Sequence, residues 1–309
     1  MSQPAPTPSA AHGRLCIVLA AVFWSLSGLF ARLLQVPTPL GLHEPSLSPL
    51  QMAFFRALFA GLFLLPMVRP RDVCFRPLMA LMVPTFAGMN ALFISALALG
   101  TAANAILLQN AAPFFVYFVS VYVLGEPADR RSLYALLLGM AGMVVIVAGT
   151  GTVGGRFDVT LMALGSGLAY GVIILCLRQM RDVSSQWLIA QNHLGSVFFL
   201  GLAVLLANGP AVWLDWVTLP TARQLGVLAV WGSVQMGLPY WLFARGLRSV
   251  SPQEAGAITL LEPLLNPAWA YLISPETDTP PATTWVGGGL ILGALAYRYF
   301  PRRQVQTTT

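Results

Sequence analysis

Ten apolar segments follow one another along the chain, each about as long as a helix that crosses a bilayer, which takes ~20 mainly apolar residues. Short polar stretches rich in turn residues separate them, as in Gly125-Glu126-Pro127 and Asn208-Gly209-Pro210. We therefore expect an all-α integral membrane protein with ten transmembrane helices. The predicted spans are 15–34, 49–67, 77–99, 103–124, 132–149, 159–177, 187–207, 222–244, 253–273 and 283–300.

Composition supports this interpretation. Of the 309 residues, 57% are hydrophobic and only 9% are charged, with a mean hydropathy of +0.72. A soluble globular protein carries about 25% charged residues, so a soluble core is excluded. All 17 basic residues are arginines. They are scattered in short segments between apolar runs, which excludes the continuous basic face of a nucleic-acid-binding protein.

The arginines also predict an orientation. Only Arg156 and Arg223 would lie on one side of the bilayer, and Arg32 and Arg56 fall inside spans, where in one interpretation both snorkel to the interface. Because cytoplasmic loops are enriched in positive charge, both termini should be cytoplasmic, in a multi-pass cell (plasma) membrane protein. The arginines on the cytoplasmic side would be Arg14, Arg69, Arg71, Arg76, Arg130, Arg131, Arg178, Arg181, Arg245, Arg248, Arg298, Arg302 and Arg303.

The two halves of the chain resemble each other at a fixed offset. When segment 251–276 is placed on segment 101–126, Pro263 falls on Pro113. A proline in a helix interior costs ~3 kcal/mol, so both helices should be broken at matched depth. Paired interruptions of this kind point to the binding site of a secondary transporter.

Two further matches extend the repeat. Residues 90–97 match 240–247 at the same offset, and Trp24 matches Tyr170 at a slightly smaller one. Five spans in each half place the second half upside down relative to the first. The expected organisation is a disordered N-terminal tail (1–13), two inverted five-helix repeats (14–150 and 151–300) and a C-terminal tail (301–309).

Several of these features together resemble the EamA-type branch of the drug/metabolite transporter superfamily, over residues 14–300. The matching features are Trp24, Arg56, Phe93 to Leu97, Phe243 to Leu247, the proline-bearing fourth and ninth spans, Leu124-Gly125-Glu126, and Glu262-Pro263. The resemblance implies ten helices around a central pathway, lined largely by spans 3, 4, 8 and 9, and export or exchange of small metabolites. Ser274-Pro275-Glu276 departs from the Leu-Gly-Glu pattern, and span 7 lacks a match to Arg56.

Glu262 is the main candidate for transport chemistry. An acid near the bilayer centre costs ~2.5–3.5 kcal/mol, so it should face the bundle interior, on one stripe with Thr259 and Asn266. One interpretation is a carboxylate that couples transport to protons or binds substrate. The other is a cap for the backbone groups freed by Pro263 and Pro267.

Other polar groups inside the spans have both a transport and a packing interpretation. His193 would couple protons or be a buried imidazole with its hydrogen bonds satisfied. Arg56 would pair with an acid or with a substrate carboxylate. The amides would line the pathway or bond helices together. The remaining candidates for the substrate pathway are Trp24, Asn90, Gln109, Asn110, Tyr170, Gln235, Tyr240 and Asn266.

The function that fits is a secondary transporter, because a chain without lysine lacks the phosphate-binding loop of an ATP-driven pump. We expect an exporter or exchanger of an amino acid-like or amphipathic solute, acting by alternating access as a monomer or homodimer. The alternatives are a lipid or polyprenyl-phosphate flippase on the same fold and, less favoured, a membrane-embedded enzyme. Three scattered cysteines and three histidines form no metal motif, so no catalytic residue, metal or cofactor is predicted.

Overall fold

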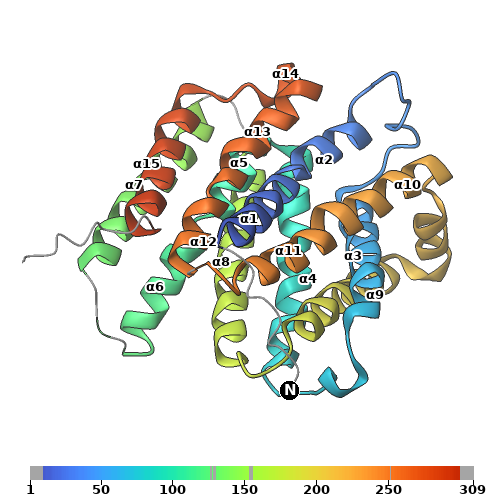
Figure 1. The fold of residues 1–309 in the computed structure, drawn as a ribbon. Helices are drawn as coiled ribbons and strands as arrows, with labels where there is room; N and C mark the ends of the chain where they lie inside the picture. The colour runs from blue at the N-terminus through green and yellow to red at the C-terminus, as the bar shows by residue number, and fades with distance from the viewer. Residues whose placement is uncertain (1–9, 126, 128–129, 153–155, 251, 300–309) are drawn as a thin grey trace, which may run out of the picture.

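The structure is a computed structural model that describes residues 10–125, 127, 130–152, 156–250 and 252–299. Within these residues the regular secondary structure is helical, and the helices pack side by side in one bundle (Figure 1). The first half contains α1 (Ala10–Ser25), α2 (Ser27–Gln35), α3 (Pro49–Leu64), η1 (Leu65–Met67), η2 (Pro70–Asp72), α4 (Met79–Leu99), α5 (Ala102–Gln109), α6 (Ala112–Tyr122) and α7 (Arg130–Thr152). The second contains α8 (Phe157–Gln179), α9 (Ser185–Thr218), α10 (Ala222–Val230), the π-helix η3 (Trp231–Gly237), α11 (Leu238–Gly246), α12 (Pro252–Thr259), α13 (Leu261–Ile273), α14 (Pro275–Asp278) and α15 (Ala282–Tyr299).

Each predicted span coincides with one helix or with consecutive helices, which confirms the all-helical fold for the described residues. Within the part of the chain that the structure describes, seven helical stretches are long and apolar enough to cross a membrane. They are Ala10–Gln35, Pro49–Met67, Met79–Leu99, Ala102–Tyr122, Phe157–Gln179, Ser185–Thr218 and Ala222–Gly246.

The predicted boundary of the N-terminal tail needs a correction. Helix α1 begins at Ala10, four residues before the predicted start of the first repeat. Gly13 is buried where α1 meets the end of α11, and a Cβ at this position would clash with Ser249 and approach the carbonyl oxygen of Gly246. Packing against α11 therefore extends the helix into the predicted tail, and the remaining residues of that tail lie outside the described ones.

The predicted breaks in the fourth and ninth spans are confirmed. Helix α5 ends at Gln109 and α6 begins at Ala112, with Pro113 in its first turn. Helix α12 ends at Thr259 and α13 begins two residues later, with Pro263 in its first turn. Because α5 packs against α13, the two broken segments lie together although they are far apart in the sequence (Figure 1).

Several of the main helix contacts recur when the two halves are exchanged. Helix α1 packs against α11, and its counterpart α8 packs against α4. Helix α4 packs against α9, and their counterparts η3 and α3 pack against each other. Three further contacts join equivalent segments directly: α3 with α9, α5 with α13, and α7 with α15. This is the contact pattern that a two-fold relation between the halves produces.

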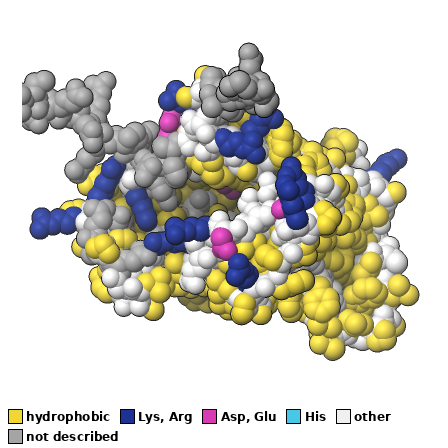
Figure 2. Space-filling model, turned by 60° about the horizontal axis from the view of Figure 1, so that its bottom comes forward, with side chains coloured by type: hydrophobic (Ala, Val, Ile, Leu, Met, Phe, Trp, Pro, Cys, Tyr) yellow, Lys and Arg dark blue, Asp and Glu magenta, His cyan; other side chains and the backbone are white. Residues whose placement is uncertain are grey.

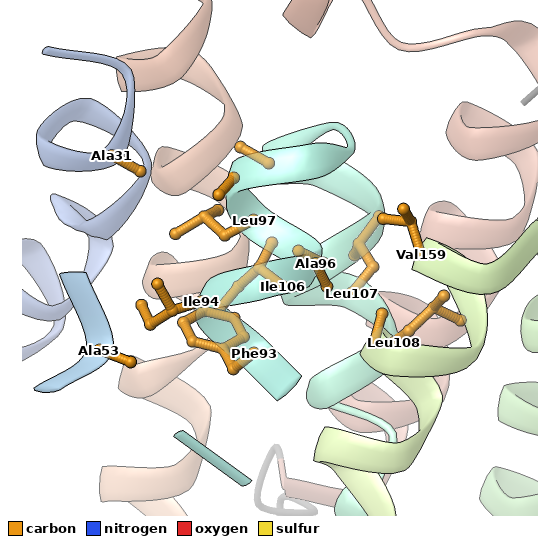
Figure 3. Close-up of a cluster of buried hydrophobic side chains, with 14 of the residues drawn as sticks. Ala31, Ala53, Phe93, Ile94, Ala96, Leu97, Ile106, Leu107, Leu108 and Val159 are labelled. Atoms are coloured by element: carbon orange, nitrogen blue, oxygen red, sulfur yellow. The ribbon is translucent and has the colours of Figure 1, made fainter. Parts of the chain in front are cut away.

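A cluster of buried apolar side chains holds α4 and α5 against the rest of the bundle (Figure 3). Phe93, Ile94 and Leu97 of α4 lie beside Ile106 of α5, and Val159 of α8 closes the cluster from the second half. Inside a bilayer these side chains would otherwise meet lipid, so van der Waals packing, rather than removal of apolar surface from water, holds the cluster together. The cluster therefore ties the first broken segment to its neighbours on both sides.

Helices α7 and α15 touch through glycines, which gives a stability prediction. A Cβ at Gly287 would lie 2.5 Å from the carbonyl oxygen of Gly142, and a Cβ at Gly142 would lie equally close to that of Gly287. We expect Gly287→Val to lower the melting temperature of the purified protein, because overpacking costs ~1–3 kcal/mol. Gly289→Val is the matched control, since no atom lies within 4 Å of a Cβ there. Equal melting temperatures for the two variants would contradict the predicted helix contact.

Candidate functional site

Three of the predicted pathway residues meet where α1 approaches η3 and α11. The ring of Trp24 lies edge-on to Tyr240, with centroids 5.3 Å apart, and 5.4 Å from the ring of Phe243. The side-chain amide of Gln235 donates to the backbone carbonyl of Trp24 at 2.7 Å. The first half of the chain is thus joined to the second by an aromatic contact and a hydrogen bond at the same place.

Glu262 lies beside this aromatic group. Its carboxylate is close enough to Tyr240 to interact with it electrostatically, and its side chain is half-buried in the first turn of α13. Among the described residues Glu262 has no hydrogen-bond or ion-pair partner, and the start of α13 has no side-chain cap. The interpretation of Glu262 as a backbone cap is therefore wrong for this conformation.

The arginine-rich end of the molecule is hollowed in its centre (Figure 2). Arginine side chains surround the hollow, and acidic atoms are visible inside it. Two ion pairs, Arg14 with Glu254 and Arg76 with Asp182, are partly or largely exposed. Charged side chains thus frame the hollow, whereas the sides of the molecule are mainly hydrophobic (Figure 2).

Arg56 is buried where α3, α4, α9 and η3 meet, with 3% of its surface exposed. Its Nη2 donates to the side-chain oxygen of Asn90. Asn90 in turn donates to the carbonyl of Ala53 at 3.0 Å and to the hydroxyl of Ser196 at 3.1 Å. The guanidinium carbon lies 5.6 Å from the ring centroid of Trp231. Asn90 therefore orients Arg56 through bonds to α3 and α9.

His193, on α9, is 1% exposed. Its ring packs edge-on against Phe86 at 4.9 Å and lies 6.3 Å from the ring of Tyr240. Neither ring nitrogen has a hydrogen-bond partner among the described residues. The prediction of a buried imidazole with satisfied hydrogen bonds is therefore wrong, and His193 joins Arg56, Trp24 and Tyr240 in one group.

The π-helix η3 supplies two members of this group, and the sequence analysis missed it. Trp231 is fully buried and Gln235 is 2% exposed. Gly232 allows the close approach of α3, because a Cβ there would lie 2.5 Å from the carbonyl oxygen of Arg56. Short π-helices inside α-helices are frequent at functional sites. Gly232 and Gly237 bracket two polar residues, Ser233 and Gln235, in an otherwise apolar segment. This spacing was the signal available in the sequence.

Asn266 holds the ninth span against the first. It is fully buried, and its amide donates to the hydroxyl of Ser27 at 2.6 Å, beside the break between α1 and α2. One turn further along α13, Trp269 donates to the hydroxyl of Ser25 at 2.9 Å. These bonds attach the ninth span to the first, as interhelical amide and hydroxyl bonds do in membrane bundles.

The other predicted pathway residues lie next to α8. Asn110 donates to the carbonyl of Ile106 at 2.9 Å and so closes the last turn of α5. Gln109 precedes it, and Gly167 of α8 packs against the backbone at this break. Tyr170, one turn along α8, is 39% exposed. The amide of Asn110 is therefore a structural group at the helix break.

An ion pair that the sequence analysis did not find lies at the end opposite the hollow. Arg32 and Asp278 are 3% and 1% exposed. The guanidinium donates twice to the carboxylate, with Nη2 3.0 Å from Oδ1, and also donates to the carbonyl of Gly100. The backbone N–H of Ala102 donates to the same carboxylate at 2.9 Å. The predicted snorkelling is wrong for Arg32, whose partner is inside the protein, and for Arg56, which is buried within the bundle.

Two depressions lie outside the polar group. A groove of about 590 Å³ runs between α4 and α9, and its lining is mostly apolar, including Met79, Val83 and Phe199. A second depression, of about 280 Å³, lies at the opposite end and is lined by Thr101 and Arg156, among others. Neither is lined by the residues around Tyr240, so these surface depressions are distinct from the candidate site.

Sequence comparison decides the family. The model of the EamA-like transporter family matches the chain twice, over residues 12–148 and 159–299. The chain belongs to the EamA-like transporter family. The two matches confirm the two repeats and the resemblance, and the several apolar helices make this member a multi-pass membrane protein.

Relatives of this EamA-like protein are named as transporters. An uncharacterized transporter of Archaeoglobus fulgidus is 29% identical over 292 residues, which covers 92% of this chain and 95% of the relative. The uncharacterized transporter YwfM of Bacillus subtilis is 28% identical over 302 residues, covering 94% and 95%. The pseudopaline exporter CntI of Pseudomonas aeruginosa is 27% identical over 250 residues, covering 79% and 84%.

A solved crystal structure shares the fold of this EamA-like chain. It superposes with a TM-score of 0.60 at 18% sequence identity, and the match covers 94% of this chain and 98% of the other. At that identity the likeness concerns the fold alone.

Proposed function

We propose that this protein is a secondary transporter that exports or exchanges a small amino acid-like or amphipathic metabolite by alternating access. The observation that carries the proposal is Glu262, a half-buried acid without a partner among the described residues and within electrostatic range of Tyr240, which packs against Trp24. An acid inside a membrane bundle is costly and marks a substrate or ion pathway. The names of the relatives, one of them a metabolite exporter, support this class of function.

The proposed topology has ten membrane crossings, two inverted repeats (14–150 and 151–300) and cytoplasmic termini in the cell membrane. The helix contacts that recur in both halves support the two-fold relation, and the odd number of spans in each half supports the inversion. The arginine-rich end that surrounds the hollow would then face the cytoplasm (Figure 2). In this conformation the hollow is the cytoplasmic mouth of the pathway.

The proposed pathway runs past Trp24, Gln235, Tyr240 and Glu262, with His193 as a second group for proton coupling. Apolar walls, amides and a few charges suit a small zwitterion or amphipathic solute better than a polyanion. Nothing in the proposal requires catalysis, a metal or a cofactor, and the relatives are named as transporters or exporters.

One observation favours the alternative of a lipid or polyprenyl-phosphate flippase. The groove between α4 and α9 is mostly apolar and opens at the surface, with Arg76 at one end and Gln191 among its lining residues. A lipid tail would fit the apolar walls and its phosphate would pair with the arginine. Translocation of a labelled lipid or polyprenyl phosphate by proteoliposomes would support this alternative.

Counterflow in proteoliposomes tests the proposed transport. Vesicles preloaded with a pooled metabolite mixture should take up the labelled solute that the protein exchanges. We expect Trp24→Ala to reduce this uptake by about tenfold or more, the effect of losing ~1.4 kcal/mol of interaction. Trp285→Ala is the matched control, because that tryptophan is 69% exposed on α15. Equal uptake by the two variants, or no uptake by the wild type, would refute the proposed pathway.

A further inference from the structure

The two buried arginines of the described chain differ in their partners. Arg32 and Arg56 are each 3% exposed, but only Arg32 has a carboxylate, that of Asp278. Within the described residues Arg56 has the neutral amide of Asn90 and the ring of Trp231. A buried charge without an opposite charge is costly, at several kcal/mol. The positive charge of Arg56 is thus uncompensated by the described protein groups.

Buried hydrogen-bond donors around Arg56 are also unused. Nε of Arg56, Nε1 of Trp231 and the two ring nitrogens of His193 are buried without a partner among the described residues, and in a neutral imidazole one of these two nitrogens is a donor. These side chains are neighbours: Arg56 lies over Trp231 and interacts electrostatically with His193. An unsatisfied buried donor costs ~1–3 kcal/mol, so several in one place point to a ligand that accepts hydrogen bonds.

We infer that Arg56, His193 and Trp231 form a subsite that binds the carboxylate of the transported solute. A carboxylate carries the missing negative charge, and its two oxygens accept about four hydrogen bonds, enough for these donors. Guanidinium and carboxylate also match in planar geometry. Asn90 holds the guanidinium in place through α3 and α9, so the orientation of the guanidinium is set before the ligand arrives.

Tyr240 relates this subsite to Glu262. Its ring lies 6.3 Å from that of His193, and it is within range of the charges of both Arg56 and Glu262. A solute beside Tyr240 would thus have a cationic side chain near one end and an acidic one near the other. That charge arrangement selects amino-carboxylates, whose carboxylate would bind Arg56 and whose ammonium group would bind Glu262. The inference rests on the proposed transport function and narrows its substrate class.

Thermal unfolding of the purified full-length protein tests this subsite without transport. The probes are a pool of common amino acids, a matched pool of their carboxamides, acetate and inorganic phosphate. We expect the amino acids to raise the melting temperature of the wild type and the carboxamides to leave it unchanged. Arg56→Met should abolish the protection. Trp231→Phe, which keeps the ring and removes one donor, should raise the half-maximal concentration by about tenfold.

The stability of the variants separates a binding role from a structural one. Arg32→Met leaves Asp278 buried and unpaired, so its melting temperature should fall steeply. Arg56→Met removes an uncompensated charge, so its melting temperature should fall by less than half as much. The inference is overturned if the melting temperature of Arg56→Met falls as far as that of Arg32→Met. It is equally overturned if amino acids still raise the melting temperature of Arg56→Met. Three results with the wild type also overturn it: carboxamides protect as well as amino acids, phosphate is the only probe that protects, or no probe protects.

The counterflow assay distinguishes failure of this subsite from failure of the transport proposal. Counterflow that depends on Trp24 but accepts carboxamides as readily as amino acids refutes the subsite and leaves transport standing. Protection by amino acids that depends on Arg56, without counterflow of any solute, supports the subsite and refutes transport.

Discussion

Asp278→Ala is expected to destabilise the protein by ~3–5 kcal/mol, the cost of leaving a buried charge without its partner. Asp278 accepts bonds from Arg32 and from the backbone of Ala102, so its loss also frees the junction between α4 and α5. The melting temperature of the detergent-purified protein, or of protein in lipid nanodiscs, measures the effect.

The exposed pair of Arg76 and Asp182 supplies the control. Its side chains are 54% and 62% exposed, and surface pairs of this kind contribute ~0–1 kcal/mol. Asp182→Ala should therefore leave the melting temperature nearly unchanged. The double variant Arg32→Met/Asp278→Leu should recover most of the loss, because apolar side chains replace both buried charges. Equal effects of Asp278→Ala and Asp182→Ala would show that the buried pair has no special role.

Glu262→Gln is expected to reduce solute accumulation driven by a pH gradient by about tenfold or more, which corresponds to at least ~1.4 kcal/mol of lost coupling. The amide has nearly the shape of the acid but cannot take up or release a proton. Uptake into proteoliposomes with and without the gradient measures the effect, with the wild type assayed in parallel.

Glu254→Gln is the matched control for this substitution. Glu254 lies one short helix earlier, on α12, and its ion pair with Arg14 is partly exposed. We expect the pH dependence of transport to survive there. If accumulation and its pH dependence also survive Glu262→Gln, Glu262 is not the coupling group and another residue, with His193 the first candidate, must be tested.

The helices and their breaks were predictable because their causes are local. An apolar run of bilayer length forms a helix wherever it lies, and a proline removes a backbone donor whatever its neighbours are. The breaks before Pro113 and Pro263 follow from these two rules. The start of α1 at Ala10 did not follow, because it depends on the contact of Gly13 with α11.

The candidate site was predicted only as a set of separate residues. Trp24, Arg56, His193, Gln235 and Tyr240 were all recognised as polar or aromatic groups within apolar spans. The residues next to them were not recognised. Trp231, for example, could not be distinguished in the sequence from other tryptophans of membrane helices. The sequence also did not predict which of these groups have hydrogen-bond or ion-pair partners. The two buried arginines are identical side chains and differ only in the residues that surround them.

By itself, the sequence determined the helical membrane fold, the two repeats, the breaks and the family, since all of these are recorded in local patterns or in similarity between segments. Only the tertiary structure decided that, among the described residues, Arg32 has a carboxylate partner and Arg56 does not, and that the nitrogens of the buried His193 have no partner there. The physical reason is distance along the chain. Arg32 and Asp278 are 246 residues apart, and no local pattern relates residues that meet only when the two halves pack together.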